Sequence, residues 1–303
     1  MTDHDDTFRR AALAPLIAAE EFRPPSTAVT VEVGALSRQG RARAVNDDHY
    51  LVIRLGRHQE TLATSLSAAE VPPRFEEYGY ALFVADGLGP GGTGSVASRV
   101  ALSTIANLTL HSGRWNLRID PGTVWEILER AEYLYATADA AVTDRRIATP
   151  ALAGMSTGLT GIYSAGHDLF VAHVGHSRAY LFRDGALVRL TRDHTIAAGA
   201  PAKRQPAAAD APAAEPCHIL TDGVGACPYP PSIEVEHFRL LNGDCVMLCT
   251  NGLTDAVADG QIADLLASRR RPADQCAALV DLASAADGDN ITVAIAQYQV
   301  PES

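Results

Sequence analysis

Short turn signals separate strand-like runs at three places in the second half of this 303-residue chain. Gly-His-Asp at 166–168, Asp-Gly at 184–185 and Asn-Gly at 242–243 each lie between runs rich in apolar residues. Such turns favour hairpins, because glycine and asparagine readily adopt the backbone conformations that a tight loop requires. The pattern therefore predicts antiparallel sheets.

Two longer segments have the periodicity of helices. Residues 95–110 and 121–142 repeat apolar side chains so that one face of each helix is apolar. We expect these faces to pack on a sheet rather than to bind a partner. The elements together predict an α+β fold, a four-layer α-β-β-α sandwich with two central antiparallel sheets.

The rest of the chain predicts one domain with an extension. Nothing between the motifs resembles a linker, so residues 28–303 are expected to form a single domain. Residues 1–27 form an N-terminal extension, in which 8–22 is predicted to be an amphipathic helix. Residues 57–77 are expected to be a polar insertion between strands. The segment 197–216, rich in Ala and Pro, is predicted to be a flexible flap, either a mobile loop or a substrate-selecting element.

Composition excludes several classes of function. A formal net charge of −11 without a basic tract argues against nucleic acid as a partner. The five cysteines lack the spacing of a zinc site or a disulfide framework, and Cys245 and Cys249 are expected to be buried reduced thiols. The acidic start and the absence of a long apolar run predict a cytoplasmic protein without a membrane partner.

Acidic residues follow or precede strand-like runs at three distant places. The apolar run 80–85 ends at Asp86 and Gly87, Asp47 and Asp48 precede another run, and Asp289 precedes a third. An Asp-Gly pair alone is often only a turn, but three acidic strand ends can converge at one edge of a sheet. Scattered carboxylates suit magnesium or manganese better than zinc.

The order of these segments resembles that of the metal-dependent protein phosphatases of the 2C type. The resemblance spans residues 31–300 and rests on segments 43–48, 84–89, 95–98, 154–158, 174–181, 190–195, 250–255 and 288–292. Any one of these segments could arise by chance, but the ordered series is hard to imitate. The resemblance implies that residues 28–303 are a catalytic domain that hydrolyses phosphoserine and phosphothreonine in proteins, opposing a serine/threonine kinase.

The resemblance also implies the roles of the site residues. Two divalent cations, manganese or magnesium, activate a water molecule that attacks phosphorus. Arg43 grips the phosphate, because a guanidinium matches two phosphate oxygens, and Asp48 orients the attacking water. The metal ligands are Asp47, Asp86, the Gly87 carbonyl, Asn251, Asp255 and Asp289, with Asp255 in an outer or third-site role.

Two positions depart from the family pattern. His176 and Asn251 stand where the family carries Asp, so we expect weaker cation binding and at most two cations. His176 could offer a nitrogen to manganese, but we expect it to be a surface imidazole near a turn. Two alternative functions stay open: a phosphatase-like regulatory or binding module with weak or no turnover, and an unrelated magnesium-dependent nucleotidase. Asp255 could instead be the cap of the next helix. Arg43 could also be a solvated surface charge.

Overall fold

The computed structural model describes residues 25–67, 70–111, 116–195, 222–226, 231–286 and 288–301. The predicted helix at 8–22 and the predicted flap at 197–216 lie outside these residues. Whether the chain divides at residue 28 therefore stays a prediction.

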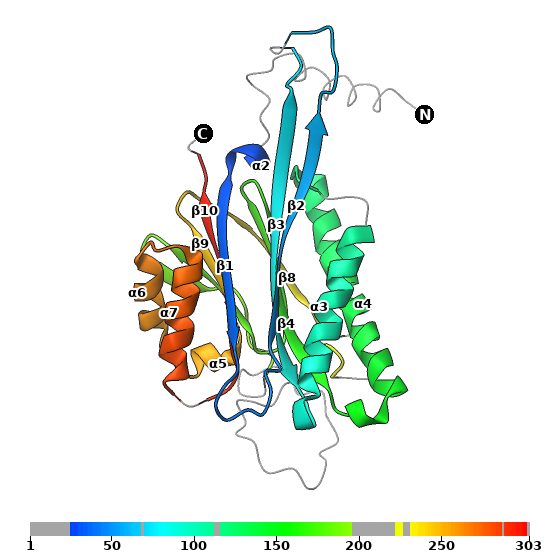
Figure 1. Cartoon of the computed structure of the whole chain (residues 1–303), viewed down its shortest axis with the longest axis vertical. Coiled ribbons are helices and arrows are strands. Elements are labelled where there is room, and N and C mark those ends of the chain that lie inside the picture. Colours follow the sequence, from blue (N-terminus) through cyan, green and yellow to red (C-terminus); the bar gives the residue numbers. More distant parts are fainter. Residues whose placement is uncertain are drawn as a thin grey trace.

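Two antiparallel five-stranded sheets form the centre of the fold (Figure 1). The first has the order β1-β10-β9-β6-β7, with strands β1 (Thr30–Arg38), β10 (Ile291–Gln299), β9 (Cys245–Cys249), β6 (Arg178–Arg183) and β7 (Ala186–Arg189). The second has the order β2-β3-β4-β5-β8, with strands β2 (His49–Glu60), β3 (Arg74–Leu88), β4 (Ser156–Ala165), β5 (Asp168–Val174) and β8 (Glu234–Arg239).

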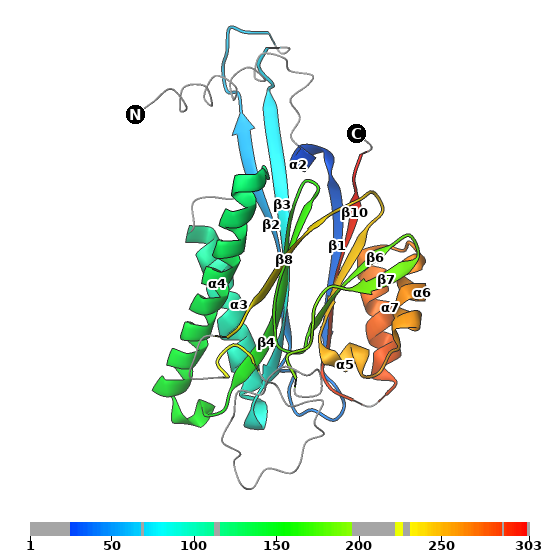
Figure 2. The ribbon, with the colours of Figure 1, turned by 180° about the vertical axis from the view of Figure 1, so that it is seen from behind.

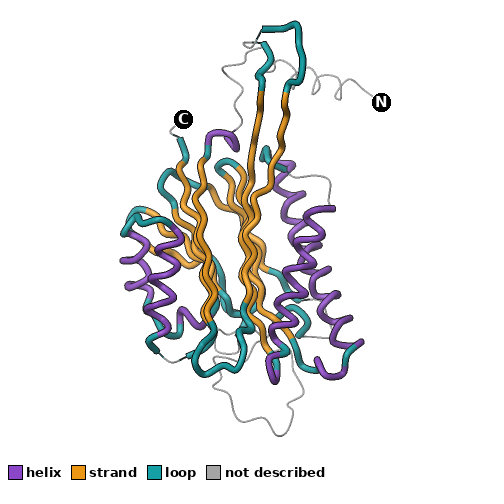
Figure 3. The backbone as a smooth tube through the Cα atoms, viewed as in Figure 1, coloured by secondary structure: helices purple, strands orange, loops and turns teal. Residues whose placement is uncertain are grey.

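Helices cover the outer face of each sheet, which completes the four predicted layers (Figures 2 and 3). The second sheet carries α3 (Gly94–His111) and α4 (Pro121–Ala148), and the first sheet carries α5 (Asn251–Thr254), α6 (Asp259–Ala267) and α7 (Pro272–Ser284). Short pieces α2 (Pro25–Ala28), η2 (Pro90–Gly92) and η3 (Pro150–Leu152) lie between these elements. None of the described helices combines the length and the apolar character that a bilayer crossing requires.

Strand β3 shows why the layers stack. Successive side chains of a strand point to opposite faces. Ala81 and Phe83 therefore pack under α3 and α4, while Leu82 and Val84 pack between the two sheets against Leu248 and its neighbours. A nearly continuous apolar run is what a strand buried on both faces requires. At the end of this buried strand the chain delivers Asp86.

Most local predictions are confirmed. Both helices form, each longer than predicted, and the turns at 166–168 and 184–185 join the hairpins β4–β5 and β6–β7. Cys245 and Cys249 are buried free thiols.

Two local predictions are wrong. The turn at 242–243 joins strands of different sheets, because β8 pairs with β5 while β9 lies between β10 and β6. Residues 57–77 are not an insertion: β2 and β3 remain paired as far as Glu60 and Arg74, and only the tip between them is a loop. Polar residues suit this hairpin because it extends beyond the body of the fold (Figure 1), where its strands have no core to bury.

Candidate metal and phosphate site

Asp86 lies near the end of β3, two residues before Leu88, the last residue of the strand. Its carboxylate is buried, and the backbone amide of Asn251 donates a hydrogen bond to it. Gly87 permits this crowding: a Cβ there would collide with the carbonyl oxygens of Asp47 and Gly94. The loop before β2 and the start of α3 can therefore pack directly against the strand end.

The pair Asp47 and Asp48 connects this loop to both halves of the molecule. One carboxylate oxygen of Asp47 accepts a 2.8 Å hydrogen bond from the Ser95 amide in the first turn of α3. Asp48 is fully buried and accepts a 2.7 Å hydrogen bond from the Thr250 hydroxyl at the end of β9. Burial, followed by the charge of Asp86, raises the pKa of Asp48 well above its ordinary value. Asp48 is thus electrostatically coupled to Asp86.

Arg43 and Asp289 contact each other. The Arg43 guanidinium donates two hydrogen bonds of 2.6 Å, one to each carboxylate oxygen of Asp289. The loops that carry them are in close contact, since a Cβ at Gly40 would collide with the Asp289 carbonyl, and the Gly40 amide donates to the Asn290 side chain at 3.1 Å. Residues predicted to bind phosphate and metal are therefore brought together, here as an ion pair.

Asn251 begins the short helix α5 beside Asp86. Its side-chain amide donates to Asp255 at 3.1 Å, and its own side chain is nearly buried. Asp255 follows the last residue of α5, and α6 begins only at Asp259, so the alternative that Asp255 caps the next helix is wrong. The charge of Asp255 contributes to raising the pKa of Asp86, so this carboxylate also belongs to the cluster.

The expectation for His176 is wrong, because its imidazole is not on the surface. The His176 and Asp86 side chains are each 7% exposed, and His176 Nε2 lies 3.5 Å from Asp86 Oδ2. A Cβ at Gly158 on β4 would lie 3.5 Å from the other ring nitrogen. The Gly175-His176 turn after β5 faces inward because β5 pairs with β4 immediately beside the end of β3.

The electrostatics at Asp86 are unfavourable without a positive partner. Burial, then the charge of Asp289, raises the pKa of Asp86 to about 8. Oδ2 is buried and accepts no hydrogen bond. A buried charge or polar atom of this kind requires a cation or a donor. Yet no three His, Cys, Asp or Glu side chains in the described part of the chain are gathered closely enough to hold a metal ion as they stand.

The donor set still fits a divalent cation. Asp86 supplies a buried oxygen without a donor, and the other members of the set are oxygen donors of the kind that magnesium and manganese bind. Within this set, the Asp289 carboxylate forms an ion pair with Arg43.

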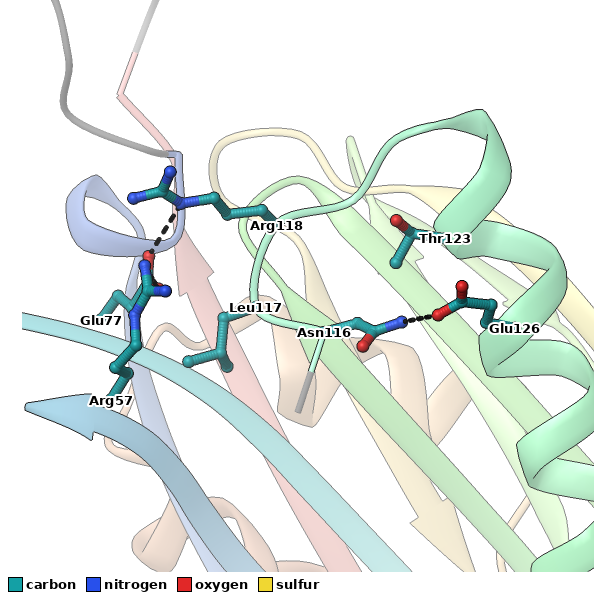
Figure 4. Close-up of a pocket in the computed structure, with 7 residues that line it drawn as sticks. All are labelled: Arg57, Glu77, Asn116, Leu117, Arg118, Thr123 and Glu126. Carbon is teal, nitrogen blue, oxygen red and sulfur yellow. Dashed lines mark hydrogen bonds and ion pairs between the residues drawn. The ribbon is translucent and has the colours of Figure 1, made fainter. Parts of the chain in front are cut away.

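A cavity of about 200 Å³ lies elsewhere, between the β2–β3 pair and the first turns of α4 (Figure 4). It is lined by Arg57, Glu77, Arg118 and four other residues, and the buried Glu77 carboxylate forms ion pairs with both arginines. None of the predicted site residues lines it. The acidic cluster, rather than this cavity, is the chemical centre that the sequence predicts.

Two threonines beside the acidic cluster were not predicted from the sequence. Thr250 and Thr292 both hydrogen bond to Asp48, and Thr250 also accepts from the Thr292 amide at 3.0 Å. The only sequence signal for them is their position beside Asn251 and Asn290. A threonine next to an acidic motif is too common to be singled out.

Comparisons with known proteins agree with this arrangement. The family model described as Protein phosphatase 2C matches residues 105–204. The serine/threonine protein phosphatase PstP of Mycobacterium tuberculosis is 29% identical over 216 residues, which are 71% of this chain and 40% of that protein. The serine/threonine phosphatase stp of Listeria monocytogenes is 28% identical over 232 residues, 73% of this chain and 85% of that protein. The chain thus spans about 40% of the length of the mycobacterial relative.

Solved structures share the fold. The catalytic domain of PstP, whose structure is described as a complex with two manganese ions, is 26% identical, with a TM-score of 0.65 over 89% of this chain and 99% of that one. The matched segment, the four-layer fold and these relatives show that the chain is similar in sequence and in fold to protein serine/threonine phosphatases of the 2C type.

Proposed function

We propose that the protein is a metal-dependent protein serine/threonine phosphatase that uses two divalent cations, manganese or magnesium. The observation that carries the proposal is Asp86, a buried carboxylate whose Oδ2 accepts no hydrogen bond and whose pKa is raised by burial and by Asp289. Three further carboxylates, those of Asp48, Asp255 and Asp289, are coupled to Asp86 or to each other. Folding brings these like charges together at a cost that a bound cation offsets.

The proposed division of labour follows from the positions of the side chains. Asp47, Asp86, Asp289, Asp255, Asn251 and the Gly87 carbonyl would hold the cations, which when bound lower the pKa of a coordinated water and supply hydroxide. Asp48 would orient that water, and its hydrogen bond from Thr250 fixes its carboxylate. Arg43 would turn from Asp289 to two oxygens of the phosphate, since one guanidinium fork fits either partner.

The relatives support the choice of substrate. Proteins named as serine/threonine phosphatases in two genera are 28–29% identical to this chain. A phosphoprotein substrate, phosphorylated by a serine/threonine kinase, and a cytoplasmic site of action follow as part of the same proposal. The proposal also retains residues 197–216 as a flap of a catalytic domain that begins near residue 28.

The test is hydrolysis of an aryl phosphate and of a phosphothreonine peptide across a manganese titration, for the wild type and Asp86→Asn. We expect manganese-dependent turnover of both substrates that Asp86→Asn abolishes. Manganese binding without turnover would instead mean a regulatory module. A strong preference for a nucleotide would mean a nucleotidase.

A further inference from the structure

We propose that His176 is a nitrogen ligand of the cation bound by Asp86, and that this imidazole makes the site prefer a first-row transition-metal ion over magnesium. The inference rests on the proposed function, because it concerns the same metal site. It concerns a residue that departs from the family pattern, so it is a property of this chain.

The distance between the two side chains carries the first step. His176 Nε2 and Asp86 Oδ2 are 3.5 Å apart. That separation is longer than an N–H···O hydrogen bond, which spans about 2.7–3.2 Å. Two donor atoms that each lie about 2.1 Å from one cation are about 3.0 Å apart at a right angle and about 3.4 Å apart at a tetrahedral angle. The observed separation is therefore close to that of two ligands of a single ion.

Burial carries the second step. Both side chains are 7% exposed, and Asp86 Oδ2 accepts no hydrogen bond. Solvent therefore cannot readily supply the positive partner that a buried carboxylate oxygen requires. A cation at this position would satisfy the Asp86 oxygen.

The chemistry of the donor set carries the third step. Asn251 supplies a neutral oxygen where a carboxylate is expected, and its side chain already donates to Asp255. Relative to a set with Asp at positions 176 and 251, this set thus loses two negative charges and gains one imidazole nitrogen. Magnesium prefers oxygen ligands and gains little from imidazole, whereas affinity for nitrogen donors rises from manganese along the first transition row. The loss of negative charge lowers the affinity of the site for every divalent cation. The imidazole nitrogen restores affinity only for transition-metal ions.

The experiment compares manganese binding by the wild type, His176→Ala and His176→Asp. Pulsed electron paramagnetic resonance of bound manganese detects the hyperfine coupling of a directly coordinated histidine nitrogen. We expect this coupling in the wild type and its loss in both variants. We also expect the ratio of manganese to magnesium affinity, measured by competition, to fall roughly tenfold in both variants. His237→Gln is the matched control, because His237 lies on the edge strand β8 and forms a hydrogen bond with Asp168 on β5.

The outcomes separate this inference from the proposed function. If manganese binds without nitrogen coupling, or if His176→Asp leaves the metal preference unchanged, the inference is overturned even where phosphatase activity is normal. If nitrogen coupling is present but no phosphoester is hydrolysed, the inference stands and the proposed function fails. His176→Asp supplies a carboxylate ligand of the kind that the family carries. It therefore still tests the inference if His176→Ala folds poorly.

Discussion

Arg43 and Asp289 form a two-point ion pair in which both hydrogen bonds measure 2.6 Å. The proposed function assigns the guanidinium to phosphate and the carboxylate to a cation. Arg43 therefore competes with the cation for Asp289, and Asp289 competes with the phosphate for Arg43. The ion pair must separate before both ligands can bind. The Arg43 side chain is 48% exposed, so separation is inexpensive.

Arg43→Gln is expected to change turnover and metal binding in opposite directions. Loss of the guanidinium should lower kcat/KM for an aryl phosphate by roughly a hundredfold, since a charge-assisted, two-point phosphate contact is lost. Release of Asp289 should tighten manganese binding by roughly threefold, the value of an exposed ion pair. Calorimetric titration measures the second effect. Unchanged manganese affinity would show that Asp289 is not a ligand or is not held by Arg43 in solution.

Asp86→Asn is expected to stabilise the cation-free protein while it removes cation binding. Folding raises the pKa of Asp86 from 3.8 to about 8. The folded state therefore binds a proton that the unfolded state lacks between about pH 4 and 8, and stability falls as pH rises through that window. In the presence of a chelator, the substitution should therefore raise the unfolding free energy by several kcal/mol at pH 8 and change it little at pH 4.

A matched control for this prediction is Asp244→Asn. Asp244 is as buried as Asp86, but Arg183 donates to both of its carboxylate oxygens, at 2.8 and 2.6 Å. Removing a paired buried charge should destabilise the protein, because it leaves the arginine without its partner. Urea denaturation of both variants checks the contrast. If both substitutions destabilise the cation-free protein, the Asp86 carboxylate is already stabilised by its neighbours in the folded protein.

Residue periodicity predicted the layers, but pairing between distant strands was beyond it. The 242–243 turn has the composition of a hairpin turn, yet the strands it joins find their partners in different sheets. Local turn chemistry specifies a change of direction, and long-range packing decides which strand is the partner. The polar residues at 57–77 led to the wrong prediction of an insertion. Paired strands without a core beneath them are polar on both faces, so they resemble a loop in sequence.

The sequence predicted that the acidic residues of the site lie together, and it was wrong about the environment of His176. The order of the acidic motifs placed Asp48, Asp86 and Asp289 near one another, and the electrostatic coupling among them agrees with that. His176 was misjudged because the turn that carries it resembles a surface turn. Its burial follows from the pairing of β4 with both β3 and β5, which no local pattern encodes.

Stability between pH 5 and 7.5 is expected to depend on His173. Burial, then the charge of His194, lowers the pKa of His173 from 6.5 to about 3. The ring is satisfied as a neutral group: Nε2 donates to the Arg192 carbonyl at 3.0 Å, and Nδ1 accepts from the Thr160 hydroxyl at 2.7 Å. Below the unfolded pKa the unfolded state binds the extra proton, so stability falls as pH falls, by about 2 kcal/mol at pH 5.

The measurement is the unfolding free energy of wild type and His173→Gln from pH 5 to 7.5. The variant will be less stable at pH 7.5 but should have a shallower pH slope. His111→Gln, which removes an exposed histidine at the end of α3, is the control and should keep the wild-type slope. An equal slope in His173→Gln would mean that another group dominates the acid response.

Gly87→Ala is expected to disrupt both the site and the fold around it. The added Cβ would meet the carbonyl oxygens of Asp47 and Gly94, which are backbone atoms that cannot rotate away. Relief requires the loop before β2 or the start of α3 to move, at a cost of about 2–3 kcal/mol in unfolding free energy. The same movement displaces Asp47 from Asp86, so manganese affinity should fall at least tenfold.

Gly260→Ala is the matched control, because nothing lies within 4 Å of a Cβ at Gly260 in the first turn of α6. Alanine is the better helix former, so this variant should be as stable as the wild type or up to about 1 kcal/mol more stable. Denaturant unfolding and manganese titration of the two variants measure the contrast. Normal metal affinity in a folded Gly87→Ala protein would show that the close packing at this strand end does not position the ligands.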